Sequence, residues 1–288
     1  MQITITPEQL ANKELSQVDL DKAVEAIRYD GFIILEDVVS PEHLDILHEK
    51  MDADLETLMT APALPVNFTE GHLQQDPPPF APYVFEDIVA NPFVTQVTKA
   101  VLGDGVFNSY YSGNTNCPGS KMQPVHIDGG QLWRGLKLAH PAARLVVNVV
   151  LEDVTEQNGS IELWPGSHLD TSVSVDDATI KVPLKTVEER WLIAVPERGN
   201  MKKGSVLIRD IRLWHRGMPN YSDRPRQMLA MIHNVGWYQR GNPLTFNKGC
   251  EAVFEECGFD PNVTFTDEPI DYIFRNRSYD YDEAEGSE

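Results

Sequence analysis

Apolar residues in the first third of the chain recur every three to four positions, which is the spacing of one helical face. The first such stripe is made up of Leu20, Ala23, Val24 and Ile27. It follows a capping residue at Ser16 or Asp19 and stops at Asp30-Gly31, so it predicts a helix between them. The second stripe is made up of Leu44, Leu47, Met51, Leu55 and Leu58. It predicts a helix that begins at Ser40-Pro41, where a capping side chain precedes a proline in the first turn.

Three further segments complete the pattern before residue 106. The short apolar run at residues 32–35 predicts a strand, and a third helix is expected from about Pro92 to Leu102, ending at Gly103. Residues 61–82 are rich in proline and polar side chains. We therefore expect them to form a loop on the surface or over a pocket.

From about residue 106 onward, short β-prone runs alternate with turn residues. These runs are residues 106–112, 122–127, 143–151, 160–164, 205–211 and 227–235. The pattern predicts an antiparallel sandwich or a cupin-like jelly roll, so the fold class is mainly β with flanking helices. Without an internal repeat, we expect one domain over residues 1–288, in which a mostly helical part (1–105) packs on a β core (106–275). Residues 171–200 are a mixed insert of the kind that forms lids or binding loops.

Charge and composition narrow the possible partners. The chain has 24 basic and 44 acidic residues, for a net charge of −20. Such a surface repels phosphate backbones and anionic lipid, so we expect neither nucleic acid nor a membrane as partner. The start lacks the features of a secretory signal, no run of 18 apolar residues occurs, and the three cysteines form no C-x-x-C. We therefore expect a cytoplasmic protein with a flexible acidic tail at residues 279–288, while its oligomeric state stays undefined.

The sequence His126-Ile127-Asp128 is the main candidate for chemistry. Residues two apart on an extended strand face the same side, so the imidazole and the carboxylate can reach one ion. His215, which follows the apolar run 205–211, is the best third ligand. Two histidines and one carboxylate leave coordination positions open and suit non-haem iron(II). By itself the spacing also fits a surface pair of His126 and Asp128, with His215 hydrogen-bonded in a turn.

Four segments widen this local signal to nearly the whole chain. They read DGFIILEDVVSPEHL at residues 30–44, GSKMQPVHID at 119–128, NGSIELWPGSH at 158–168 and WHRGMPNYSDRPR at 214–226. In content and order they resemble the phytanoyl-CoA dioxygenase family of iron(II)- and 2-oxoglutarate-dependent oxygenases. The resemblance implies a double-stranded β-helix with Fe(II) in one mouth of the barrel. It also implies that 2-oxoglutarate and O2 are consumed and that succinate and CO2 are released. The family's halogenases lack the carboxylate that Asp128 supplies here, so hydroxylation or another oxygenase outcome is expected.

The distal carboxylate of 2-oxoglutarate needs a cation, and a planar guanidinium can bind it through two hydrogen bonds. Arg226 lies eleven residues after His215 and matches the family's arginine, with Arg224 as the rival on the same strand face. Gln123 lies where relatives often place a glutamine that contacts the cosubstrate, although it could equally face solvent.

Asn148 interrupts the apolar run 145–151, and a buried amide must be hydrogen-bonded. It falls where the family places a residue that contacts 2-oxoglutarate, often a tryptophan, so it departs in type. The alternative is an amide that only satisfies neighbouring backbone. A second departure is Ile161, which stands where many relatives have threonine; Ser160 or another group would then substitute.

Two residues are candidates for the substrate pocket. Gln131 and Trp133 follow Asp128 closely and are candidates for the substrate pocket, and the acidic chain favours a small-molecule metabolite. Two alternatives remain open. One is a jelly-roll metalloenzyme that uses the triad without 2-oxoglutarate, and the other is a jelly-roll binding protein without catalytic activity.

Overall fold

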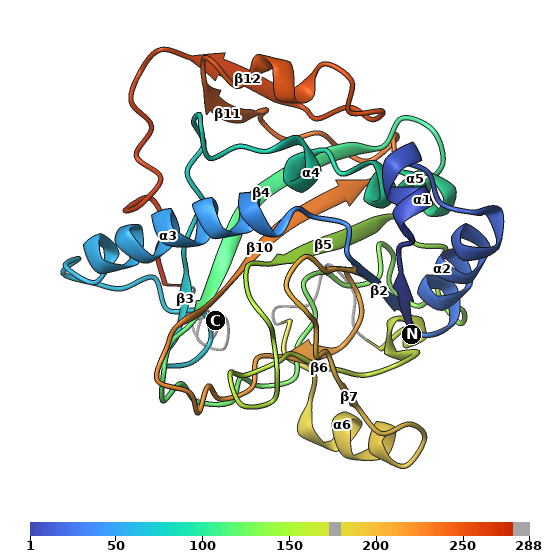
Figure 1. Ribbon diagram of the computed structural model, residues 1–288. Coiled ribbons are helices and arrows are strands. Elements are labelled where there is room, and N and C mark those ends of the chain that lie inside the picture. Colours follow the sequence, from blue (N-terminus) through green and yellow to red (C-terminus); the bar gives the residue numbers. More distant parts are fainter. Residues whose placement is uncertain (173–179, 279–288) are drawn as a thin grey trace.

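A computed structural model describes residues 1–172 and 180–278, and its centre is a seven-stranded sheet (Figure 1). In spatial order the strands are β1 (Gln2–Thr4), β2 (Phe32–Glu36), β8 (Val206–Asp210), β5 (Arg144–Val150), β10 (Arg226–Asn234), β4 (Phe107–Asn116) and β3 (His72–Gln74). Neighbouring strands are antiparallel, except that β1 runs parallel to β2. The predicted strands at 32–35, 106–112, 143–151, 205–211 and 227–235 are thereby confirmed.

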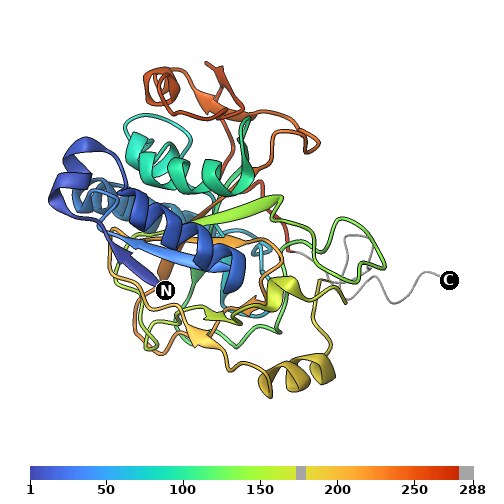
Figure 2. The same ribbon diagram turned by 90° about the vertical axis from the view of Figure 1, so that its right-hand side faces the viewer.

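A smaller sheet lies below the large one in Figures 1 and 2. It consists of β7 (Glu197–Arg198), β6 (Glu162–Leu163) and β9 (His215–Arg216), in that order. His126 extends its edge, because its backbone exchanges two 2.9 Å hydrogen bonds with His215. The predicted strand at 122–127 is otherwise wrong: these residues form isolated bridges only. Pro124, which cannot donate to a ladder, lies within the segment. A third, two-stranded sheet pairs β11 (Leu244–Asn247) with β12 (Val263–Thr266).

Helices cover the opposite face of the large sheet (Figures 1 and 2). The helices are α1 (Pro7–Asn12), α2 (Gln17–Tyr29), α3 (Pro41–Leu58), α4 (Glu86–Val89), α5 (Pro92–Leu102) and α6 (Leu184–Trp191), of which α6 alone lies below the small sheet. The three predicted helices are confirmed as α2, α3 and α5. Ser16 caps α2 by accepting from the backbone of Asp19 at 3.1 Å. Ser40 precedes α3, but its side chain makes no capping hydrogen bond.

Strands β2 and β5 bury both of their faces, in two separate cores. Ile33 and Leu35 of β2 point to the helices, together with Val147 of β5. Their neighbours Phe32 and Ile34 point to the small sheet. Because side chains alternate along a strand, the large sheet is the middle layer between the helices and the small sheet. The functional candidates lie on the side of the small sheet.

Two predicted segments have a different or limited outcome. Residues 61–82, expected to be a loop, also contribute β3 at the edge of the large sheet. The insert at 171–200 contains α6 and β7, while residues 173–179 and the tail 279–288 lie outside the described residues. Among the helices of the described chain, none has the length and apolar character that crossing a membrane requires.

Candidate metal and cosubstrate site

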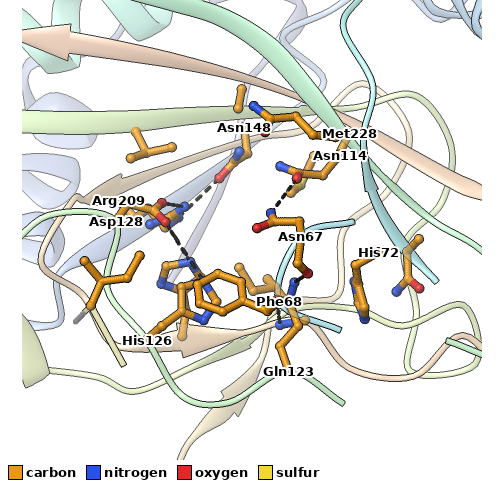
Figure 3. Close-up of a pocket in the computed structure, with 18 of the residues that line it drawn as sticks. Asn67, Phe68, His72, Asn114, Gln123, His126, Asp128, Asn148, Arg209 and Met228 are labelled. Carbon is orange, nitrogen blue, oxygen red and sulfur yellow. Dashed lines mark hydrogen bonds and ion pairs between the residues drawn. The ribbon is translucent and has the colours of Figure 1, made fainter. Parts of the chain in front are cut away.

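A cavity of about 470 Å³ lies between the two sheets (Figure 3). The large sheet supplies alternate residues of its inner strands, including Val146 and Asn148 of β5 and Met228 and Ala230 of β10. All three residues of the predicted metal triad line the same space.

His126, Asp128 and His215 converge at one point of this cavity. Their ligand atoms all lie within 4.8 Å of one another. Oδ1 of Asp128 is 4.0 Å from Nε2 of His126 and 3.6 Å from Nε2 of His215. The backbone pairing of residue 126 with residue 215 sets this geometry, because it brings together segments 89 positions apart in the chain. Both imidazoles are buried, whereas the Asp128 side chain is 32% exposed toward the cavity.

The two histidines present the same nitrogen to this point. Nδ1 of His126 donates to the carbonyl of Pro124 and Nδ1 of His215 donates to the carbonyl of Leu213, both at 2.9 Å. Since a carbonyl only accepts, the proton of each neutral ring sits on Nδ1 and the lone pair of Nε2 is free for a metal. Burial lowers the pKa of both rings, and Arg209 lowers them further against the opposing effect of Asp128. The rings are therefore neutral, as metal ligands must be.

Asp128 remains ionised in spite of its surroundings. Burial acts to raise the pKa of Asp128, but Arg209 and the two histidines outweigh it, so the pKa falls well below its usual range. Arg209 forms an ion pair with Oδ2 of Asp128 through Nη2 (Figure 3). Arg209 is not among the residues predicted from the sequence, although its charge inside the otherwise mostly apolar run 205–211 is a signal for it.

Arg226 is the second cation of the cavity. It is 5% exposed, and burial lowers its pKa to about 10. Nη2 donates to the carbonyl of Gly159 at 3.0 Å, while Nε finds no partner within the described chain. Gly159 has φ +80, and a Cβ there would lie 2.3 Å from Nδ2 of Asn116, so this turn requires glycine. The rival Arg224 is exposed and does not line the cavity.

Gln123 and Asn148, the two predicted amide contacts, line the cavity, and each also bonds to the cavity wall. Gln123 accepts from the backbone of Gly217 at 2.7 Å and donates to the carbonyl of Asn67 at 3.0 Å. Asn148 accepts from Nε of Arg209 at 3.2 Å and donates to the carbonyl of Leu229 at 3.3 Å. Each amide joins two segments of the cavity wall, and these bonds give it a structural role.

The structure does not bring Gln131 and Trp133 to the cavity lining. Gln131 is buried, donates to the carbonyls of His168 and Asp170, and accepts from Arg212. Trp133 is 54% exposed and packs edge-on against His140. Ile161, the residue in place of the family's threonine, does line the cavity.

The loop at residues 61–82 supplies one wall of the cavity, which is one of the two positions expected for it from the sequence. Phe68 packs on His126 with ring centroids 4.1 Å apart, and Asn67 donates to Oδ1 of Asn114 at 3.1 Å (Figure 3). His72 also lines the cavity, and burial, with Arg226 and His126 adding to it, lowers its pKa to about 4. These contacts join residues far apart in the sequence, so the proline-rich composition could predict a loop on the surface or over a pocket but not the individual side chains that line it.

The donor set and the buried guanidinium fit a metal with a bound dicarboxylate. Two neutral imidazoles and one carboxylate form the facial triad that non-haem iron oxygenases use. Within residues 1–172 and 180–278, Nη2 of Arg226 bonds to Gly159 and Nε has no partner, so this guanidinium suits a carboxylate in the same cavity.

The chain belongs to the phytanoyl-CoA dioxygenase (PhyH) family, whose model matches residues 27–228. The family predicted from the four sequence segments is thus confirmed. One curated relative is the dioxygenase af480 of Aspergillus fumigatus, which is 26% identical over 164 residues. That match covers 56% of this chain and 47% of the relative, so it spans just under half of the relative's length.

Two solved structures resemble the fold. The first is the non-heme alpha-ketoglutarate-dependent carbocyclase SnoK from nogalamycin biosynthesis, with a TM-score of 0.56 and 19% identity over 76% of this chain and 84% of that one. The second is AviO1 from Streptomyces viridochromogenes Tue57, with a TM-score of 0.55 and 20% identity over 79% of this chain and 100% of that one. At these identities the similarity shows a shared sheet-rich fold.

Proposed function

We propose that this protein is an iron(II)- and 2-oxoglutarate-dependent dioxygenase that hydroxylates a small-molecule metabolite. The observation that carries the proposal is the convergence of His126, Asp128 and His215 in a cavity that also contains the buried Arg226. Family membership supports it. The two-sheet arrangement supports the finer fold assignment, a double-stranded β-helix that forms a single domain with its helices.

Each residue has a defined task in this proposal. His126, Asp128 and His215 hold Fe(II), and Arg226 pairs with the distal carboxylate of 2-oxoglutarate. When bound, iron and cosubstrate supply an oxidant for C–H bonds and release succinate and CO2. Phe68 packs on His126, and Val146, Met228 and Ala230 give the cavity an apolar side against which the substrate C–H bond would lie.

The test is anaerobic addition of Fe(II) and 2-oxoglutarate to the protein, followed by visible absorption. We expect a metal-to-ligand charge-transfer band that is lost in His215→Ala. Arg226→Ala should require roughly 100-fold more 2-oxoglutarate, because it leaves a carboxylate without its buried charge partner. Arg224→Ala, at an exposed position outside the cavity, is the control and should bind like the unaltered protein.

Other outcomes would favour the alternatives. Iron binding without any band, at every 2-oxoglutarate concentration, would indicate a metalloenzyme that does not use this cosubstrate. Absence of iron binding would leave a binding protein of the same fold.

A further inference from the structure

The geometry points to Arg209 as a positioning residue that makes Asp128 a one-oxygen ligand of the metal. This inference rests on the proposed function. It concerns the orientation of the Asp128 carboxylate toward the metal, whereas the proposed function concerns which residues bind the metal.

The two oxygens of Asp128 have separate partners. Oδ1 faces Nε2 of both histidines, at 4.0 and 3.6 Å. Oδ2 is held by Nη2 of Arg209 in an ion pair (Figure 3). A charge-assisted hydrogen bond of this kind fixes the rotation of the carboxylate. Only Oδ1 is then directed at the point where the three ligands meet.

Arg209 is itself held by the large sheet. It is 4% exposed, and its cross-strand partner in β5 is Val146. Nε of Arg209 donates to Oδ1 of Asn148 at 3.2 Å, and Nδ2 of Asn148 donates to the carbonyl of Leu229 in β10 at 3.3 Å. A chain of hydrogen bonds therefore runs from three strands of the sheet to the metal ligand, and a planar guanidinium is needed to span its two ends.

The consequence concerns the open coordination positions. An iron site of this type takes about six ligands, of which the triad supplies three when its carboxylate binds through one oxygen. A chelating cosubstrate fills two more, so a single position remains for oxygen. If Asp128 bound through both oxygens it would occupy that position. Arg209 keeps it open by engaging Oδ2.

The experiment is a titration of the metal-free full-length protein with Co(II) alone, followed by its visible d–d absorption, whose intensity reports coordination number. We expect Arg209→Met to bind Co(II) about 10- to 100-fold more weakly, the usual effect of losing an outer partner of a ligand, and with an altered spectrum. Arg209→Lys retains the charge but cannot reach both Asn148 and Asp128. It should also show the altered spectrum, and Asn148→Ala should shift the spectrum in the same direction.

Arg212→Met is the matched control. Arg212 is also 4% exposed and forms a buried ion pair, with Asp210, but it lies outside the cavity lining. It should lose thermal stability yet bind Co(II) with the original affinity and spectrum. Full recovery of both properties in Arg209→Lys would overturn the inference, because charge alone would then suffice. So would an unchanged spectrum in Arg209→Met and Asn148→Ala. Failure of the unaltered protein to bind Co(II) would instead overturn the proposed metal site, and this inference with it.

Discussion

At the scale of single residues, burial keeps several histidines neutral. His233 of β10 is 2% exposed, its Nδ1 lies 3.1 Å from Oγ1 of Thr98, and its Nε2 has no partner in the part of the chain that is described. Burial lowers the pKa of His233 to about 4. His72, on the opposite side of the sheet, has its pKa lowered to about 4 as well, by burial and then by Arg226 and His126.

These pKa values predict a loss of stability in mild acid. Between about pH 6.5 and pH 4 the unfolded chain binds a proton at each of these histidines while the folded chain does not, so the free energy of unfolding falls as the pH falls. Each such histidine contributes a slope of up to about 1.4 kcal/mol per pH unit. Urea unfolding over this range should show a shallower slope for His233→Gln than for the unaltered protein. His43→Gln, at a partly exposed position, serves as the control, and an equal slope in both variants would contradict the prediction.

Which site residues can be predicted from the sequence depends on how many positions separate the interacting residues along the chain. His126 and Asp128 could be found because residues i and i+2 of an extended segment point to the same side, even where the segment forms no regular strand, and His215 because of the motif around it. Arg209 and Asn148 each appear as a polar residue within an apolar strand, but their pairing depends on the register of β5 with β8. The fold sets that register and the local sequence does not, and a shift of one residue would turn either side chain to the other face of the sheet.

At the scale of elements, the first residues of α3 and α5 show how far local sequence predicts capping. Asn91 and Ser40 each precede a proline in the first turn of a helix, and both are good capping residues. Asn91 accepts from the backbone of Phe93 and Val94, at 3.0 and 3.1 Å, whereas Ser40 makes no such bond. The backbone of Ser40 is instead tied to the carboxylate of Asp87 at 2.8 Å. Local sequence thus predicts where both helices begin, but tertiary contacts decide which side chain caps.

Asn91→Ala should therefore destabilise the protein by about 2 to 3 kcal/mol. It removes the cap and also two bonds from Nδ2, to the carbonyls of Val38 and Asp87 at 2.8 Å, one of which joins two segments of the core. Ser40→Ala should change the free energy of unfolding by less than about 0.5 kcal/mol, since the hydroxyl caps nothing. The free energy of unfolding of the two variants is measured by urea unfolding at neutral pH. An equal loss of free energy in both variants would show that capping is not the cause.

At the scale of the whole molecule, the last described residues return to the cavity wall. Ser278 donates to the carbonyl of Leu64 at 2.8 Å, and Tyr272 donates to the carboxylate of Asp54 in α3 at 2.9 Å. Between them, Arg275 forms an ion pair with Asp76, whose side chain is 1% exposed. The C-terminal segment therefore holds the loop at residues 61–82 in place, and that loop supplies Phe68 and His72 to the cavity. No local pattern in residues 270–278 predicts this contact, because both partners are polar segments without periodicity.

Breaking the ion pair between Arg275 and Asp76 should destabilise the loop at residues 61–82 more than the large sheet. Among the described residues, Arg275→Met leaves the buried carboxylate of Asp76 with Ser112 alone as partner. We expect a loss of about 2 to 3 kcal/mol, below the full effect for a buried pair because Arg275 is 46% exposed. Hydrogen exchange should accelerate at residues 64–74 while the amides of β5 stay protected. Adding Asp76→Asn to the variant should restore much of the stability, because it removes the uncompensated charge.

Arg240→Met, which breaks an exposed pair with Asp260, should cost less than about 1 kcal/mol and leave the exchange of the loop unchanged. If both arginine variants changed the stability and the exchange of the loop equally, residues 270–278 would not hold the loop in place. A selective effect of Arg275→Met at residues 64–74 would make these residues part of the structure that forms the site.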